Sequence, residues 1–128
     1  MQALKNILLV GMGGFVGSAL RYLVSGWAQS WMKSAVFPVG TATVNILGCL
    51  AIGLLGGLAE NTQMFSPQLR LFVFLGLLGG FTTFSTFGYE TMALVRDGEL
   101  LLAFANVAFQ LIFGFAAVLI GYNTTKFF

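Results

Sequence analysis

Charged residues are scarce in this sequence of 128 residues, and histidine is absent. Charged residues make up 8% of the chain, against about 25% in a typical soluble domain, so they cannot coat a globule. Without histidine and with a single cysteine, Cys49, the chain lacks the side chains for histidine-based catalysis, a thiolate metal cluster or an intrachain disulfide. A scattered net charge of +2 indicates no nucleic-acid partner. We expect neither an enzyme nor a soluble binding domain.

The sequence contains long apolar segments instead. Four runs without any charged residue cover residues 6–20, 34–59, 71–89 and 100–125. A membrane-spanning helix needs about 20 mostly apolar residues. These runs predict an all-α membrane protein, a single domain over residues 1–128, with four transmembrane helices at about 3–24, 40–59, 69–94 and 100–122.

The basic residues divide evenly between the two sides of the membrane. With four spans, the N-terminus, the middle loop and the C-terminus share one side. That side carries Lys5, Arg70 and Lys126, and the opposite side carries Arg21, Lys33 and Arg96. The positive-inside rule therefore indicates no preferred orientation. Either a span boundary is misplaced, or the chain inserts in both orientations and pairs antiparallel with itself.

Small residues recur at helical spacing in the first span, where they reduce the width of the predicted helix on one face. Gly13 and Gly17 form a G-x-x-x-G pair, flanked by Gly14 and Ser18. Such residues let helix backbones approach closely in lipid. The pattern predicts tight packing of this helix against a neighbour.

The middle of the third span departs from ordinary lipid-facing helix. Residues 79–87 contain two adjacent glycines followed by four hydroxyl side chains and three phenylalanines. Irregular backbone at membrane depth is tolerated only where protein buries it or where it lines a wet cavity. A break at Gly79-Gly80 would free carbonyl and amide groups, as in the discontinuous helices that build ion sites in transporters.

Two kinds of side chain sort onto separate faces if the segment after the break is helical. Phe84 and Phe87 lie close together on one side. A hydroxyl stripe at i, i+3, i+4 and i+7 lies on another: Thr82, Ser85, Thr86 and Tyr89. Positive ring edges and hydroxyls can both meet a small anion. The alternative is a Phe-rich lipid face with hydroxyls bonded back to i−4 carbonyls.

Neutral amides on two other spans favour a lined pathway. Asn45 lies inside the second span, and Asn106 and Gln110 lie at i and i+4 in the fourth. Each of these amides alone could simply form a hydrogen bond that stabilises the contact between two helices. Arg21 and Glu90 are the charges expected partly within the membrane, where they either pair with each other or reach an interface. We assign them a structural role.

The sequence resembles the Fluc (CrcB) family of small bacterial fluoride channels nearly end to end. The resemblance rests on a Gly-rich first helix leading to Leu20-Arg21-Tyr22, on residues 40–45 and 79–87, and on Glu90. It implies a fluoride-selective channel in the bacterial inner membrane that lets fluoride leave passively and so protects against fluoride toxicity. It also implies a dual-topology, antiparallel homodimer with two fluoride pathways.

The same resemblance implies roles for particular residues. The carbonyls of Gly79 and Thr82 from both chains would hold a central structural sodium ion (Na+). The fluoride pathway would include the ring edges of Phe84 and Phe87 and the amide of Asn45. Ser85 and Thr86 would belong to a track of hydroxyl groups along it. Some relatives carry Tyr or Ser where this chain has Asn106 and Gln110, so the role of Gln110 is less firmly implied.

Two rivals come from other classes. A proton-coupled small multidrug transporter is also a four-span, dual-topology dimer, but it needs a membrane-embedded carboxylate. The first span has no acid, and Glu90 lies near the end of its span. A non-transporting membrane scaffold subunit would leave the polar stripes without a purpose. The fluoride channel is therefore the favoured interpretation.

Overall fold

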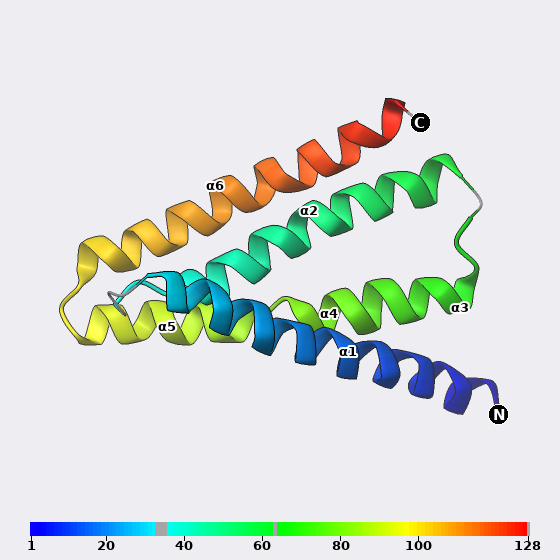
Figure 1. Ribbon diagram of the computed structural model, residues 1–128, viewed down its shortest axis with the longest axis horizontal. Helices are drawn as coiled ribbons and strands as arrows, with labels where there is room; N and C mark the ends of the chain where they lie inside the picture. The colour runs from blue at the N-terminus through cyan, green and yellow to red at the C-terminus, as the bar shows by residue number, and fades with distance from the viewer. Residues whose placement is uncertain (33–35, 63, 128) are drawn as a thin grey trace.

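The computed structural model describes residues 1–32, 36–62 and 64–127, and these ranges contain helices and connecting turns but no strand. Four apolar segments are long enough to cross a membrane: Gln2–Trp31, Val39–Asn61, Pro67–Arg96 and Leu100–Phe127. The prediction of four membrane-spanning helices is thereby confirmed. Both termini and the connection from α2 to α3 lie at one end of the bundle, and the turn from α5 to α6 lies at the other (Figure 1).

The first helix, α1 (Gln2–Trp31), is longer than predicted. We expected it to end near Val24, but no helix-breaking proline follows until Pro38. The extra turns carry Trp27 and Trp31, whose rings meet edge to face with centroids 5.2 Å apart. Lys33, which the sequence places on the same side of the membrane as Arg21 and Arg96, lies outside the described residues.

Helices α2 (Val39–Asn61) and α6 (Leu100–Thr124) lie side by side along most of their length (Figure 1). Glycines allow this contact: a Cβ at Gly121 would stand 2.7 Å from the backbone nitrogen of Leu54. A 3₁₀ turn, η2 (Thr125–Phe127), continues α6, and buried Thr125 accepts a hydrogen bond from Asn61 at 3.3 Å.

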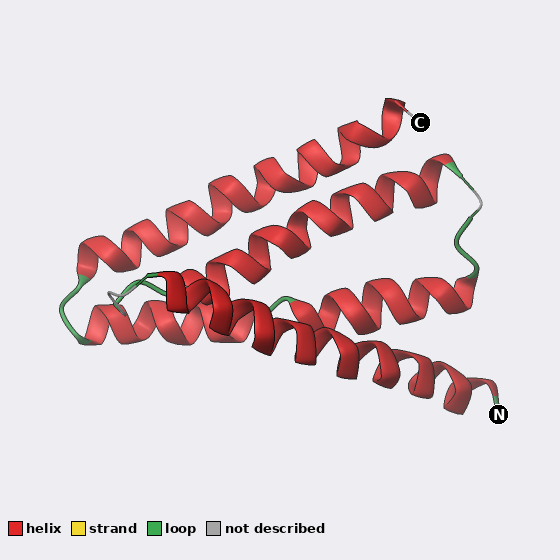
Figure 2. Cartoon of the chain, viewed as in Figure 1, coloured by secondary structure: helices red, strands yellow, loops and turns green. Residues whose placement is uncertain are grey.

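The third span consists of four pieces with different winding. Ser66 caps α3 (Pro67–Arg70), and the π-helix η1 (Leu71–Leu78), α4 (Gly79–Phe81) and α5 (Phe84–Arg96) follow. Thr82 and Thr83 between α4 and α5 are extended, with φ/ψ of −90°/160° and −152°/116°. Figure 2 shows this interruption as a short loop partway along the span.

The predicted position of the break, Gly79-Gly80, is wrong. Gly79 has helical φ/ψ of −62°/−36°, and Gly80 lies inside α4. The glycine pair allows helix packing instead: a Cβ at Gly80 would stand 2.6 Å from the carbonyl oxygen of Gly14 on α1. Gly13 and Gly17 meet η1 and α4 in the same way, as a Cβ at Gly17 would stand 2.9 Å from the nitrogen of Phe81. The G-x-x-x-G pair thus packs α1 against the third span.

Candidate functional site

The extended residues Thr82 and Thr83 carry the first part of the site. The Thr83 hydroxyl caps α5 by accepting from the Thr86 N–H at 3.2 Å, and the Thr83 N–H donates to Asn45 Oδ1 at 2.8 Å. In a continuous α-helix those two N–H groups would donate to the carbonyls of Thr82 and Gly79. The interruption therefore removes the helical donors from both carbonyls.

These two carbonyls suit a hard cation. Backbone carbonyls released by broken helices coordinate Na+ in other membrane proteins. The described residues contain no cluster of three His, Cys, Asp or Glu side chains that could hold a metal ion. Arg21 Nη1 approaches the Thr82 carbonyl at 3.4 Å, and the Thr82 hydroxyl donates to the Leu78 carbonyl at 2.9 Å. The donor set of this chain is thus neutral oxygen, with a guanidinium close to one of the two carbonyls.

A chain of side-chain amides connects the break to α6 and returns to α5. Asn45 Nδ2 donates to Gln110 Oε1 at 2.7 Å, and Gln110 Nε2 donates to Asn106 Oδ1 at 2.9 Å. Asn106 Nδ2 donates to Thr91 Oγ1 at 2.9 Å, whose hydroxyl donates to the Phe87 carbonyl at 2.8 Å. The structure brings together the amides that the sequence placed on separate spans. We call this chain the amide relay.

A cavity of about 380 Å³ opens beside the break. Its polar wall is formed by Asn45, Gln110, Thr82 and Thr83, and its aromatic wall includes Phe84 and Phe87. The Phe84 and Phe87 rings lie 5.6 Å apart at an interplanar angle of 48°. Phe84 is 83% exposed in the single chain although it lies in the middle of a membrane span. We call this space the aromatic cavity.

A second cavity, of about 310 Å³, is also lined by Thr83 and contains Arg21. Hydroxyl side chains from α1, α2, the break and α5 line it with Val44: Ser18, Tyr22, Ser25, Thr41, Thr83 and Thr86. The ion pair found among the described residues joins Arg96 to Asp97, so Arg21 has no carboxylate partner there. This arginine cavity offers a positive charge and hydroxyl groups to an anion.

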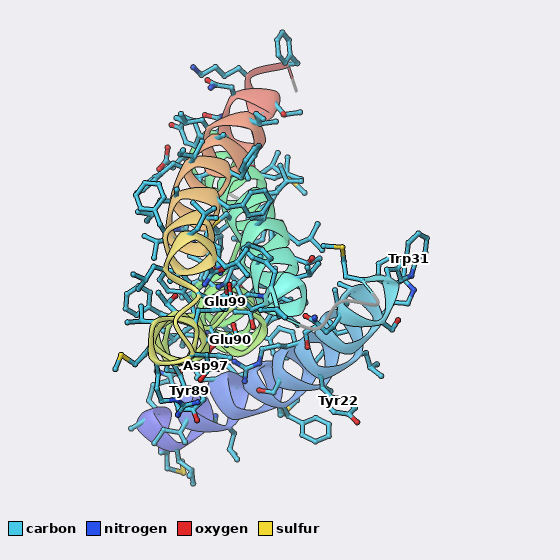
Figure 3. The ribbon with its side chains drawn as sticks, turned by 90° about the vertical axis from the view of Figure 1, so that its left-hand side faces the viewer. Tyr22, Trp31, Tyr89, Glu90, Asp97 and Glu99 are labelled. Atoms are coloured by element: carbon cyan, nitrogen blue, oxygen red, sulfur yellow. The ribbon has the colours of Figure 1, made fainter. Side chains whose placement is uncertain are left out.

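Glu90 does not pair with Arg21 in the described part of the chain. Its Oε1 accepts from the Thr41 hydroxyl at 2.7 Å, and its buried Oε2 has no partner among the described residues. Figure 3 shows Glu90 between the helices, with Asp97 and Glu99 nearby at the same end of the bundle. All three carboxylates line a further cavity of about 670 Å³. The predicted alternative in which Glu90 pairs with Arg21 is therefore wrong for the single chain.

The predicted hydroxyl stripe of Thr82, Ser85, Thr86 and Tyr89 forms only in part, because only its last three residues lie in α5. Thr82 precedes α5 and bonds back to α4, so it does not share a helix face with Ser85 and Thr86. Thr86 accepts from the Thr83 hydroxyl at 3.0 Å, and Ser85 lies 3.4 Å from that hydroxyl. Tyr89 is exposed and lines neither the aromatic nor the arginine cavity.

Two functional residues were missed in the sequence. Thr83 lines both cavities, and Thr91 ends the amide relay. A threonine directly before a helix is a common N-cap signal, which could have identified Thr83. Thr91 lies one turn after Phe87 in an ordinary helical sequence, and only its packing against Asn106 reveals it.

Comparison with known proteins agrees with this geometry. Residues 8–122 match the family described as "CrcB-like protein, Camphor Resistance (CrcB)". The chain is 42% identical over 121 residues to the "Fluoride-specific ion channel FluC" of Methylobacillus flagellatus, covering 94% of each chain. It is 49% identical over 116 residues to the protein of that name from Chlorobium chlorochromatii, covering 91% of this chain and 88% of the relative.

A third relative has the same extent. The "Fluoride-specific ion channel FluC" of Chlorobaculum tepidum is 48% identical over 120 residues, which cover 94% of both chains. The family match spans all four helices, the interruption at Thr82-Thr83 and the amide relay. This chain belongs to the CrcB family.

Proposed function

We propose that this protein is a fluoride-selective channel whose ions pass through the aromatic cavity. The observation that carries the proposal is the composition of that cavity: amides and hydroxyls face Phe84 and Phe87 at a helix interruption inside a membrane span. Relatives that match over most of their length are named fluoride-specific ion channels.

The chemistry of the lining suits a small anion. Fluoride holds its hydration water tightly, so a pore must replace that water with several close donors. The amides of Asn45 and Gln110 line the aromatic cavity, and aromatic ring edges carry partial positive charge. Asn106 is fully buried and accepts a hydrogen bond from Gln110, while Ser85 and Thr86 lie beside the Thr83 hydroxyl that borders the cavity. A site without fixed charge also releases the ion readily, as conduction requires.

The arginine cavity is the proposed approach to this pathway. Arg21 lies beside six hydroxyl-bearing residues, and Thr83 forms part of both cavities. A positive charge in a cavity with low-dielectric walls raises the local concentration of anions. Beyond the structural role predicted from the sequence, Arg21 would therefore attract fluoride, while the neutral donors of the aromatic cavity carry the ion.

The working unit is an antiparallel homodimer of dual-topology chains. Phe84 is exposed in the middle of a span in the single chain, and the basic residues show no bias between the two sides. A second chain covering the aromatic cavity would complete the wall opposite Asn45 and Gln110. The twofold arrangement gives each dimer two equivalent pathways.

A structural sodium ion fits the interruption of the third span. Gly79 and Thr82 have lost their helical donors to Asn45 and to the cap of α5. The two carbonyls of one chain are too few to enclose a cation, so the carbonyls of both chains of the dimer would hold it. Sodium would supply positive charge that fixes the two interrupted helices against each other.

The proposed setting is the inner membrane of a bacterium. Fluoride would leave the cell passively down its electrochemical gradient. An inside-negative potential favours this direction by about 2.3 kcal/mol per 100 mV for one elementary charge. The channel would thereby protect the cell from fluoride toxicity.

The test is fluoride release from liposomes that contain the purified protein. A fluoride-selective electrode should record release that is much faster than from protein-free liposomes, while a chloride electrode records little. Equal rates for the two halides would overturn the proposal. Reporter tags on the C-terminus should locate it on both sides of the membrane in one population of cells, and a single orientation would exclude the antiparallel dimer.

A further inference from the structure

The side-chain amide of Gln29 on α1 caps the beginning of α2. Helix α2 starts after Pro38, whose own side chain cannot cap, so the first amides of the helix need acceptors from elsewhere. Gln29 Oε1 accepts from the Gly40 N–H at 3.0 Å, and Gln29 Nε2 donates to the Phe37 carbonyl at 3.2 Å. Because a backbone N–H can only donate and a carbonyl can only accept, the amide cannot flip without losing both bonds. We call this arrangement the Gln29 clamp.

The clamp holds α2 at the point where its backbone meets α1. Gly40 is buried, and a Cβ there would stand 3.1 Å from the carbonyl carbon of Ser25, which lies one turn before Gln29. The ring of Phe37 meets the ring of Phe109 on α6 edge to face, with centroids 6.4 Å apart. The first turn of α2 is thus fixed against two other helices.

This first turn of α2 borders two cavities of opposite charge. Thr41 lines the arginine cavity, whereas Pro38, three residues earlier, lines the cavity of about 670 Å³ that contains three carboxylates. We call the latter the acidic cavity, and Figure 3 looks onto its carboxylates: Glu90, Asp97 and Glu99. The two cavities adjoin at the Thr41 hydroxyl, which donates to Glu90 Oε1 at 2.7 Å.

Carboxylates close to the approach of an anion oppose its entry. None of the described residues that line the acidic cavity is basic. Asp97 pairs with Arg96 at 3.4 Å, and Glu99 has no ion-pair partner in the part of the chain that the structure describes. One carboxylate about 12 Å from an anion, in a medium of effective dielectric constant about 20, lowers the occupancy of that anion about tenfold. The separation of the two cavities therefore affects how readily an anion enters.

We propose that Gln29 is a positioning residue that keeps the acidic cavity separate from the approach of the anion. The inference rests on the proposed function, in which the anion is fluoride and the arginine cavity is its approach. With the clamp intact, the first turn of α2 screens the anion from the carboxylates. Without the clamp, this turn separates from α1 and the two cavities merge. Gln29 lines the acidic cavity and not the arginine cavity, so it acts through the position of Thr41.

The first test measures fluoride flux in liposomes at two ionic strengths. Gln29→Met should lower the flux about tenfold at low salt, where the carboxylates oppose anion entry. Raising the ionic strength with potassium gluconate from about 0.01 M to about 0.15 M shortens the Debye length from about 30 Å to about 8 Å and should recover most of the flux. The control is Gln68→Met, the same change on an exposed residue of α3, which should conduct like the parent in both salts. Parental flux in Gln29→Met, or an equal loss in both salts, would overturn the proposal.

The second test removes one carboxylate from the acidic cavity. Glu99→Gln should recover the flux of Gln29→Met several-fold at low salt. The same substitution in the parent should change the flux less than about twofold, because the clamped turn already screens this charge. A purely structural role of Gln29 would leave its loss unaffected by Glu99→Gln. Equal gains from Glu99→Gln in both backgrounds would also contradict the screening role.

Folding is measured separately from conduction. Size-exclusion chromatography and the thermal unfolding midpoint show whether Gln29→Met is folded. If it is not, Gln29→Glu keeps an oxygen for the Gly40 N–H and loses only the donor to Phe37, and it should lower the flux with the same dependence on salt. Parental flux in folded Gln29→Glu at low ionic strength would contradict the proposal. If the parent protein itself carries fluoride no faster than chloride, the proposed function fails, and that result is distinct because it needs no variant.

Discussion

The third span contains two halves that are held in place by different forces. Before the break, η1 and α4 lie against α1 through backbone contacts, because Gly13, Gly17 and Gly80 leave no side chain between the helices. After the break, α5 is tied to α2 and α6 by side-chain hydrogen bonds from Thr41, Asn45 and Asn106.

This difference separates a half fixed by shape from a half fixed by polar groups. Backbone-to-backbone packing leaves no room for a single added methyl group, so it defines the position of the Gly79 and Thr82 carbonyls tightly. Side-chain hydrogen bonds in membranes are worth only about 0.6–2 kcal/mol each, so the second half tolerates single changes. Substitutions in the two halves should therefore differ in kind, by loss of folding in the first half and by loss of conduction or a small loss of stability in the second.

The largest effect is expected for Gly17→Val. The new Cβ would stand 2.9 Å from the nitrogen of Phe81 and 3.0 Å from the carbonyl carbon of Leu77, so α1 and the third span must separate. Overpacking typically costs about 1–3 kcal/mol, and rigid backbone on both sides places this site at the upper end. The yield of folded protein in size-exclusion chromatography and the thermal unfolding midpoint measure the loss.

Gly11→Val is the matched control for this substitution. A Cβ at Gly11 would meet no atom within 4 Å, and the residue lies on the same helix as Gly17. The Gly11→Val variant should yield as much folded protein as the parent. Equal loss in both variants would show that helix flexibility, not close approach, explains the glycines of α1.

The next largest effect is expected for Phe84→Ile and Phe87→Ile in the second half. Each substitution removes a ring edge from the aromatic cavity while keeping an apolar side chain, so the protein should remain folded. We expect fluoride flux to fall about tenfold or more, equivalent to about 1.4 kcal/mol in the barrier. Liposome flux measures this, and parental rates in both variants would exclude a role for the rings.

A smaller effect is expected for Thr83→Val. The change removes the N-cap of α5 and its bond to Thr86, and an N-cap is worth about 1 kcal/mol. The backbone bonds between residue 83 and Asn45 survive, so folding should be retained with a lower thermal midpoint. Thr83→Ser keeps the cap and should restore that midpoint. If serine fails to restore it, the cap is not what stabilises α5.

The smallest effect is expected for Thr91→Val at the end of the amide relay. Asn106 loses an acceptor, which should cost about 0.6 kcal/mol, the mean for such bonds in a membrane protein. The thermal unfolding midpoint of the protein should shift slightly, with little change in fluoride flux. A large loss of flux would show that the relay does more than stabilise the helices.

The sequence was sufficient for the number of spans and for the residue types of the site. Long charge-free runs identify membrane helices because lipid excludes charge. The hydroxyls and phenylalanines of residues 79–87 left two interpretations open, and only together with the amides of the other spans did they favour an ion pathway, which stays a prediction. The packing role of Gly13 and Gly17 also followed from their spacing.

The position of the break could not be predicted in the same way. Glycine both weakens helices and permits close approach, and local sequence does not say which property is used. At Gly80 the neighbours are Gly14 and Ser18 of α1, which lie more than 60 residues earlier in the chain. The break at Thr82-Thr83 depends on Asn45 of α2 taking the Thr83 N–H, a contact that no local pattern reveals.

The length of α1 has a consequence for the choice of lipid. At a rise of about 1.5 Å per residue, its 30 residues extend about 45 Å, well beyond a hydrocarbon core of about 30 Å. Such a helix must tilt or protrude, and Trp27 and Trp31 favour the headgroup level at one end. Because Gly13 and Gly17 pack directly against the backbone of η1 and α4, we expect tilt of α1 to move the half of the third span that precedes Thr82. Fluoride flux should therefore depend on acyl-chain length, with bilayer thickness acting as a mechanical input to the ion site.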